Sequence, residues 1–357
     1  LVHKLLKPNI WNLCPVTHKV YFRSFGVELE VSDGQTILDA ALAAKLDYPC
    51  GCQSGNCGAC KSSLLSGEVD LAPYSQFALE DSERVQGLVL ACRSIPLGDC
   101  EIRPLDQDEI VAHAHREMEC RISHITEATH DIRVIGVDVI DGGPFKFSSG
   151  QYATLTFANM PPRDFSMANR TNDDRLEFHI RHVDGGKVSD HILNGLKVGD
   201  RIKVKGPYGV SYLRELHRGP ILAIAGSTGL APIKSIVDTA LQTGMKQSIY
   251  LYFGVRAERD LYFMNQLEQL TKEYSSLTFT PVLSEPSNGN IYRTGLVTDA
   301  VLTDFDDLDG CKAYIAGPPA MVETAIEKLQ LLGIQREDCH ADAFYTEAEK
   351  AVLDQEK

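Results

Sequence analysis

The sequence lacks several features that would point to common protein classes. No stretch approaches the ~18 consecutive apolar residues of a membrane-spanning helix. Basic residues are in the minority, with 35 lysines and arginines against 49 aspartates and glutamates and a net charge of −14. Nucleic-acid binding needs basic patches, so this balance argues against it. No Ser/His/Asp triad or paired-carboxylate site stands out, and the 11 histidines show no metal-binding spacing.

Most of the ten cysteines show no pairing pattern. Six of them are scattered along the chain: Cys14, Cys50, Cys100, Cys120, Cys311 and Cys339. This usage fits a reducing cytoplasm, where disulfides are rare. Residues 1–17 contain no long apolar core, so we expect an N-terminal extension rather than a signal peptide.

The other four cysteines form the most informative pattern in the chain. The run Cys52-Gln-Ser-Gly-Asn-Cys57-Gly-Ala-Cys60 is followed by Cys92 at the end of an apolar run. This C-x4-C-x2-C spacing with a distant fourth cysteine is typical of a plant-type [2Fe–2S] cluster. A zinc site, disulfides or unligated thiols are the alternatives. Zinc sites usually pair two Cys-x2-Cys knuckles, and only Cys57 and Cys60 make one.

The acidity is concentrated around this motif. Residues 18–110 hold seven basic and fifteen acidic residues, more than half of the net negative charge on about a quarter of the chain. A solvated acidic surface would explain the excess. A negative face toward a basic partner would explain it equally well.

Three patterns of predicted elements divide the chain. Residues 18–110 show two short strands, a helix over Thr36–Lys45 and the cysteine loop, the order of a small β-grasp domain. Residues 116–216 show regularly spaced short strands, which predict an antiparallel sandwich or barrel. Residues 217–346 alternate strands with helices, which predicts an α/β domain with a parallel sheet covered on both faces. At 357 residues, such a multidomain chain is expected.

The middle segment carries candidate flavin-binding residues. In Arg163-Asp-Phe165-Ser166, the guanidinium suits a pyrophosphate, the ring can stack on an isoalloxazine, and the hydroxyl can lie near its reactive edge. A second arginine, Arg181, precedes Gly185-Gly186 and a predicted helix start at Ser189. Glycine amides and a helix N-terminus suit a phosphate.

The last segment carries candidate nucleotide-binding residues. Gly226-Ser-Thr228-Gly229 lies between a predicted strand and a predicted helix, where α/β sheets bind nucleotides. A plain tight turn is the alternative. Gly317-Pro318 forms a second glycine-containing turn of this kind after a later strand. Glu285 follows the third strand, where a carboxylate would accept hydrogen bonds from a ribose 2′-hydroxyl and repel a 2′-phosphate, so the sequence favours NADH over NADPH.

Together these motifs resemble the ferredoxin–NADP reductase superfamily, in the subgroup with an N-terminal plant-type [2Fe–2S] ferredoxin domain. Reductase components of bacterial aromatic-ring oxygenases, such as benzoate dioxygenase reductase, have this arrangement. The resemblance implies an FAD-binding β-barrel and an NAD(P)H-binding α/β domain after the ferredoxin domain. Phe165 stands in place of the family's tyrosine, Ser227 in place of its second glycine, and Ala316 in place of its cysteine.

The resemblance also implies roles for individual residues. Those expected at the reacting edge of the flavin are Ser166, Thr228 and Phe344, with Tyr345 as an alternative to Phe344. Those expected to bind FAD are Arg163, Phe165, Ser166, Arg181, Gly185, Gly186 and Ser189. Those expected to bind the nicotinamide cofactor are Gly226, Thr228, Gly229, Arg256, Glu285, Gly317 and Pro318. The cluster ligands are Cys52, Cys57, Cys60 and Cys92.

We therefore expect an NADH-dependent iron–sulfur flavoprotein oxidoreductase that passes electrons from NADH through FAD and [2Fe–2S] to an external acceptor. A terminal oxygenase of the Rieske non-haem iron or di-iron type, or its ferredoxin, is the first hypothesis. A deoxysugar (CDP-glucoseen) dehydrase is the second, and a redox-sensing flavoprotein with little turnover is the third. We expect a cytoplasmic monomer that binds neither nucleic acid nor membrane.

Overall fold

A computed structural model describes residues 17–76, 78–105, 109, 111, 113–346 and 349. The chain divides into two compact units, one built from Leu1–Tyr48 with Gln53–Leu105 and the other from Pro49–Cys52 with Asp106–Lys357. Of the predicted extension, residues 1–16 lie outside the described part, and Thr17 already begins the first strand. No helix in the described ranges is both long enough and apolar enough to cross a bilayer.

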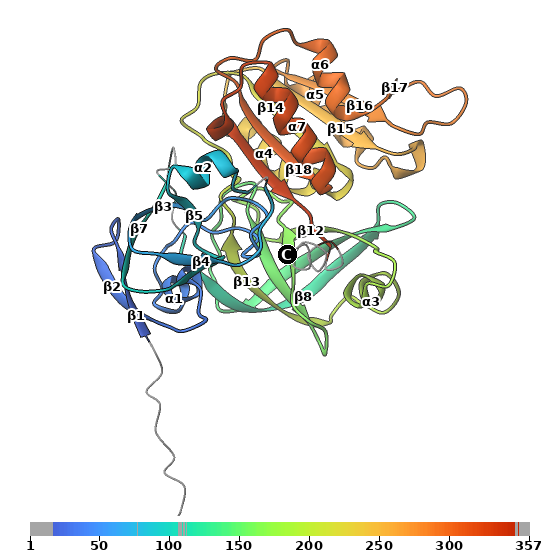
Figure 1. The fold of residues 1–357 in the computed structure, drawn as a ribbon. Helices are drawn as coiled ribbons and strands as arrows, with labels where there is room; N and C mark the ends of the chain where they lie inside the picture. The colour runs from blue at the N-terminus through green and yellow to red at the C-terminus, as the bar shows by residue number, and fades with distance from the viewer. Residues whose placement is uncertain are drawn as a thin grey trace, which may run out of the picture. The chain divides into compact units, whose positions relative to one another are not determined.

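The first unit is built on a five-stranded mixed sheet with the order β2-β1-β7-β3-β5 (Figure 1). Its strands are β1 Thr17–Phe22, β2 Val27–Ser32, β3 Lys61–Ser66, β5 Leu88–Leu90 and β7 Cys100–Pro104. Strands β1 and β7 run parallel and the other pairs antiparallel. This arrangement confirms the predicted β-grasp domain.

The predicted helix of this unit is α1, Ile37–Ala43. Thr36 is its N-cap, since the threonine hydroxyl accepts a hydrogen bond from the backbone N–H of Asp39 at 3.1 Å. Five elements were not predicted from the sequence: strands β3 and β7, strand β4 Val69–Leu71, strand β6 Ser94–Pro96 and helix α2 Asp81–Val85.

The second unit contains an antiparallel sheet of six strands with the order β11-β10-β13-β8-β9-β12. They are β8 Arg116–Glu127, β9 Ile132–Asp141, β10 Tyr152–Phe157, β11 Arg163–Ser166, β12 Leu176–Arg181 and β13 Arg201–Tyr208. A bridge from Met167, just after β11, to Phe178 within β12 joins the two outer strands, so the sheet closes into the expected barrel. Helix α3, Lys187–Asn194, follows β12.

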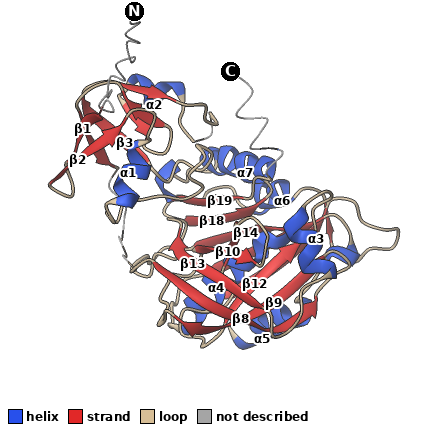
Figure 2. Cartoon of the chain, turned by 90° about the horizontal axis from the view of Figure 1, so that it is seen from below, coloured by secondary structure: helices blue, strands red, loops and turns tan. Residues whose placement is uncertain are grey.

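The same unit contains a parallel sheet with the order β17-β16-β15-β14-β18-β19. Its strands are β14 Ile221–Gly226, β15 Ile249–Val255, β16 Leu277–Leu283, β17 Arg293–Thr294, β18 Lys312–Gly317 and β19 Cys339–Ala343. Its helices are α4 Leu230–Gln242, α5 Met264–Glu273, α6 Val297–Asp304 and α7 Pro319–Leu331 (Figure 2).

Helices cover both faces of this parallel sheet, as its apolar strands predict. Ala223 of β14 packs in one cluster with Ile233 of α4, while its neighbour Ile224 faces Val301 of α6 and Leu329 of α7. The strand order reverses at β14, which has β15 on one side and β18 on the other. Nucleotides bind in α/β sheets beyond the carboxyl ends of strands at such a reversal.

Candidate functional site

The cysteine loop of the first unit depends on two glycines in the left-handed region. Gly55 has φ +79° and Gly58 has φ +73°. A Cβ at Gly55 would lie 2.8 Å from the side chain of Arg93, and one at Gly58 would lie 3.0 Å from the carbonyl oxygen of Ala78. The loop is therefore compact in a way that only glycine permits at these positions.

The structure brings Cys60 and Cys92 together. Both are buried, and the backbone nitrogen of Cys92 lies 3.5 Å from Sγ of Cys60. Cys92 follows β5 by two residues rather than ending the strand itself. Cys57 is half-buried in the same unit, and Cys52 belongs to the segment Pro49–Cys52 of the second unit. A backbone amide directed at a cysteine sulfur and a compact loop of thiols fit an iron–sulfur cluster, and the four-ligand set remains a prediction.

Cysteines elsewhere in the chain have a different environment. Burial raises the pKa of Cys100 to about 11 and that of Cys120, Cys311 and Cys339 to about 12. They therefore remain neutral thiols at physiological pH, whereas metal ligands must be thiolates.

The candidate flavin strand β11 presents Ser166 to a carboxyl group far away in sequence. Ser166 is buried, and its hydroxyl donates a hydrogen bond to Oδ2 of Asp342 at 3.1 Å. Phe165 packs partly against the barrel core, and Nη1 of Arg163 donates to the carbonyl oxygen of Pro162 at 2.7 Å. The strand thus supplies a cation, a ring and a hydroxyl within four residues.

Asp342 is a candidate functional residue that the sequence did not reveal. It lies on β19, which was not predicted, and pairs in register with Ala316 of β18. Burial raises its pKa to about 7, and the hydrogen bond from Ser166 opposes that rise only in part. A carboxyl group that exchanges a proton near neutrality, beside a flavin-strand hydroxyl, can orient that hydroxyl or hold a proton for it.

The candidate phosphate segment begins its helix earlier than predicted. Helix α3 starts at Lys187 with Gly186 as N-cap, so the predicted start at Ser189 was wrong. The Ser189 hydroxyl accepts from the backbone N–H of Val183 at 3.0 Å and donates to the carbonyl oxygen of Gly186 at 3.0 Å. Its hydroxyl shapes the turn, whose Gly185 has φ +75°. The N-terminus of a helix suits a phosphate.

Arg181 lies apart from that segment, in the nucleotide pocket described below. Its Nε donates to Oδ2 of Asp131 at 2.7 Å. Burial alone would raise the pKa of Asp131, but hydrogen bonds from Arg181 and Thr129 reverse this and lower it. The pairing keeps the guanidinium fixed beside the pocket.

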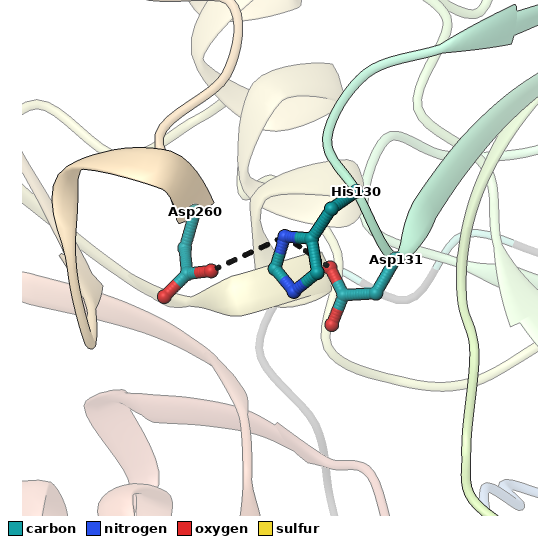
Figure 3. A group of neighbouring side chains, drawn as sticks. All are labelled: His130, Asp131 and Asp260. Atoms are coloured by element: carbon teal, nitrogen blue, oxygen red, sulfur yellow. Dashed lines mark ion pairs between the residues drawn. The ribbon is translucent and has the colours of Figure 1, made fainter.

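A histidine also approaches Asp131. In Figure 3, His130 lies between Asp131 and Asp260, with its Nδ1 3.8 Å from a carboxylate oxygen of each. These groups could offer metal ligands, but exposed acidic groups are common without an ion. The contact that fixes Asp131 is its 2.7 Å bond to Arg181, since both distances to His130 exceed hydrogen-bond length.

A pocket of about 190 Å³ opens beyond the carboxyl ends of the parallel strands. Its lining combines glycines, cations and acidic groups: Asp131, Ile132, Arg181, Gly226, Ser227, Gly254, Val255, Arg256, Asp260, Val282, Ser284, Gly295, Leu296, Val297, Pro318 and Met321. Of the predicted nucleotide residues it includes Gly226, Arg256 and Pro318.

Close packing explains the glycines at the back of this pocket. A Cβ at Gly229 would lie 2.0 Å from the carbonyl oxygen of Ala316, and a Cβ at Gly226 would lie 2.5 Å from Sδ of Met321. A Cβ at Gly317, which has φ +145°, would lie 2.8 Å from the carbonyl oxygen of Gly226. The two candidate turns therefore meet, and half-buried Thr228 lies between Gly226 and Gly229 in the first.

Glu285 lies at the rim rather than in the pocket. Its backbone nitrogen donates to the carbonyl oxygen of Arg256 at 2.7 Å, and its side chain is exposed. Among the described residues, the lining reaches its neighbour Ser284. A bound ribose would have to approach this rim for the carboxylate to touch it.

Phe344 follows β19 directly. Its backbone nitrogen donates to the carbonyl oxygen of Gly317 at 2.9 Å, and its ring packs against the core of the nucleotide domain. The alternative aromatic, Tyr345, instead donates its hydroxyl to Glu323 at 2.8 Å. Strand β19 and the residue after it thus contact the flavin strand, through Asp342, and the Gly317 turn, through Phe344.

Family models match the chain in the order that its motifs predict. A 2Fe-2S iron-sulfur cluster binding domain matches residues 21–97, an oxidoreductase FAD-binding domain residues 119–213, and an oxidoreductase NAD-binding domain residues 223–327. These matches and the three domain folds define an iron–sulfur flavoprotein oxidoreductase of the ferredoxin–NADP reductase type.

Among similar curated proteins is the ferredoxin–NAD(P)+ reductase component of the naphthalene 1,2-dioxygenase/salicylate 5-hydroxylase systems of Ralstonia sp. It is 40% identical over 89% of this chain and 96% of its own length. The corresponding component of the Pseudomonas putida naphthalene 1,2-dioxygenase system is 40% identical over 88% of this chain and 94% of its own length. The chain belongs to this family of oxygenase-system reductase components.

Solved structures agree with this assignment. The Amycolatopsis cytochrome P450 reductase GcoB superposes with a TM-score of 0.76 at 34% identity, covering 92% of this chain and 99% of that one. The ferredoxin reductase in carbazole 1,9a-dioxygenase has a TM-score of 0.69 at 27% identity with the same coverage.

Proposed function

We propose that this chain is the NADH-oxidising reductase of an oxygenase system and delivers electrons singly to the oxygenase or its ferredoxin. The observation that carries the proposal is the position of β19. Its Asp342 holds the flavin-strand residue Ser166, and the following Phe344 is bonded to Gly317 at the nucleotide turn. A nicotinamide and a flavin bound at these sites would lie next to each other.

We propose domain limits of 18–110, 116–216 and 217–346 for the cluster, FAD and nucleotide parts. Cys52, Cys57, Cys60 and Cys92 would hold the cluster. When bound, FAD would supply hydride acceptance from NADH and the cluster would supply one-electron transfer. The chain's own residues would supply binding and orientation: Arg163 and the start of α3 for the FAD phosphates, Phe165 for stacking and Ser166 for a hydroxyl at the reacting edge.

Replacing Arg163 by alanine tests the flavin assignment. Removing the guanidinium should lower FAD retention and NADH–dye activity together, because the pyrophosphate loses its charged partner. Bound flavin is measured by absorbance after gel filtration, and activity with an artificial two-electron acceptor. Arg175→Ala is the matched control, since Arg175 pairs with Asp138 on the barrel at 2.9 Å. Full flavin loading and unchanged turnover in Arg163→Ala would count against the assignment.

The preference for NADH over NADPH is proposed for Glu285. Its carboxylate would repel a 2′-phosphate at the pocket rim, and Arg256 next to the same rim would otherwise attract it. Glu285→Gln should therefore lower the KM for NADPH and raise the KM for NADH. The ratio of the NADPH KM to the NADH KM should fall by about tenfold. Glu273→Gln on α5 is the control. An unchanged ratio would remove Glu285 from coenzyme selection.

We further propose that the acceptor is an oxygenase of the Rieske non-haem iron or di-iron type, and that the chain acts as a cytoplasmic monomer. The names of its relatives support an oxygenase partner, and the acidic excess in residues 18–110 supports docking to a basic surface. Electron transfer to that partner should then weaken as salt is raised, while NADH–dye activity stays constant. Salt-independent transfer would contradict electrostatic docking.

A further inference from the structure

Helix α4 carries two buried polar side chains that the nucleotide motif does not account for. Lys234 is only 8% exposed and Ser235 is 0% exposed. Both lie in the second turn of this helix, which begins directly after the nucleotide turn Ser227–Gly229. Lysine side chains are almost never buried unless their charge is paired. The contacts of these two residues therefore indicate what they do.

Both side chains bind the segment that follows the flavin strand. Nζ of Lys234 donates a hydrogen bond to the carbonyl oxygen of Ala168 at 3.2 Å. Oγ of Ser235 donates to the carbonyl oxygen of Asn169 at 2.6 Å. Ala168 and Asn169 are buried and lie just beyond β11, which ends at Ser166. Two consecutive helix residues thus donate to two consecutive carbonyl groups, and we call this pair of contacts the α4 clamp.

The charges around the buried ammonium come from both sides of the clamp. Oε1 of Glu177, on β12 of the barrel, lies 3.5 Å from Nζ, and Oδ2 of Asp238, one turn along α4, lies 3.2 Å from it. Burial alone would raise the pKa of Glu177, but the hydrogen bond from His179 and the charge of Lys234 lower it to about 2. Glu177 is therefore ionised, and an ion pair between barrel and helix holds Lys234 in place.

The clamp lies close to both proposed cofactor sites. Lys234 is five residues from Gly229 of the nucleotide turn, roughly 8 Å along a helix axis. Ala168 is two residues from Ser166, the proposed hydroxyl at the flavin edge. Because Ser166 belongs to the barrel and Gly229 to the nucleotide domain, contacts between the two domains set their separation. Asp342 makes one such contact with the Ser166 side chain, and the clamp fixes the backbone that follows it.

We propose that Lys234 and Ser235 are positioning residues for hydride transfer, which clamp the nucleotide helix to the flavin strand and so align the nicotinamide with the flavin. The inference rests on the proposed function, in which NADH reduces FAD. Neither residue belongs to the described lining of the nucleotide pocket, so each cofactor should bind normally without the clamp. The alignment of the two cofactors should be lost, and a displacement of about 1 Å can slow a reaction about hundredfold.

Lys234→Met in the full-length holoprotein tests the proposal. Methionine retains much of the side-chain packing but cannot donate to Ala168. The limiting rate of anaerobic flavin bleaching at saturating NADH should fall by about tenfold or more, while FAD content and the dissociation constant of NADH stay within about twofold of wild type. Titrating the dithionite-reduced protein with NAD+ should also give a weaker long-wavelength charge-transfer absorbance, which reports stacking of the two rings without turnover.

Lys328→Met is the matched control for this substitution. Nζ of Lys328 lies 3.3 Å from Oγ1 of Thr298 and pairs with Asp299, and all three residues belong to the nucleotide domain. The control removes a half-buried ammonium without loosening the contact between the domains. It should leave both the bleaching rate and the charge-transfer absorbance at their wild-type values.

Ser235→Ala decides the question if Lys234→Met fails to fold or loses FAD. It removes a single hydroxyl, and Thr239, farther along α4, still lies 2.7 Å from Ser149 of the segment before β10. We expect the bleaching rate to fall about threefold, with unchanged affinity for NADH. Wild-type bleaching rates in the folded variants, or a defect that appears only as weaker binding of NADH, would overturn the proposal. A wild-type protein whose flavin is not reduced by NADH would instead contradict the proposed function.

Discussion

Cys57→Ala is expected to abolish the absorbance of the [2Fe–2S] cluster and the reduction of cytochrome c, a one-electron acceptor. NADH-dependent reduction of a two-electron dye should survive, because it needs only the flavin and nucleotide sites of the second unit. Cys57 lies in the loop where Gly55 and Gly58 adopt positive φ, and each iron of the cluster needs two thiolates, so removing one leaves an iron short of a ligand. Both activities and the visible spectrum are measured on the same preparation.

Cys100→Ala is the matched control for this experiment. Cys100 is buried in β7 of the same unit, and burial raises its pKa to about 11, so it remains a thiol. The control should keep the cluster and both activities. If Cys57→Ala folded, retained FAD and still lost dye reduction, electrons could not leave the flavin site before the cluster, and the proposed order would be wrong.

Ser166→Ala is expected to lower the rate of NADH–dye reduction about hundredfold while FAD stays bound. A donor aimed at the reacting edge contributes about this much when it acts in a dry, preorganised site. Ser166 is buried, with its hydroxyl 3.1 Å from Oδ2 of Asp342. When that carboxyl, whose pKa burial raises to about 7, is protonated and donates to Ser166, the serine proton is available to the flavin edge. Stopped-flow flavin bleaching by NADH measures the step directly.

Ser149→Ala controls for the loss of a buried hydroxyl in the same unit. Ser149 is 2% exposed and its hydroxyl lies 2.7 Å from that of Thr239. It should reduce the dye at the wild-type rate. The dye-reduction rate of Asp342→Asn should fall between those of Ser166→Ala and Ser149→Ala, since an amide can still accept from Ser166 but cannot exchange a proton. A Ser166→Ala protein that bleaches at the wild-type rate would remove this hydroxyl from the reaction.

Local patterns in the sequence were sufficient for most of the fold. The alternation along 27–31 corresponds to β2, and the apolar run 221–226 corresponds to β14. Both strands could be predicted because strand periodicity and burial are visible in residues that are neighbours along the chain. Strand β19 escaped prediction because its Cys-His-Ala-Asp-Ala sequence has no strand periodicity and is fixed by pairing with β18. The start of α3 was misplaced because Gly186, not a side-chain cap, begins it.

The parts of the site that the sequence missed depend on distant partners. Ser166 was recognised from its motif, but Asp342 lies 176 residues away and no local pattern connects them. Lys234 and Ala168 are separated by 66 residues and meet only because α4 packs beside the barrel. A motif identifies the residues that touch a cofactor, whereas the residues that hold them in place emerge from packing.

Anaerobic addition of NADH to the purified holoprotein, followed by low-temperature electron paramagnetic resonance, tests the central claim most directly. The account predicts that NADH alone produces the signal of a reduced [2Fe–2S] cluster, that removing FAD abolishes this response, and that dithionite restores it. A cluster that NADH reduces equally well without FAD, or protein that contains zinc and no iron or acid-labile sulfide, would contradict the account.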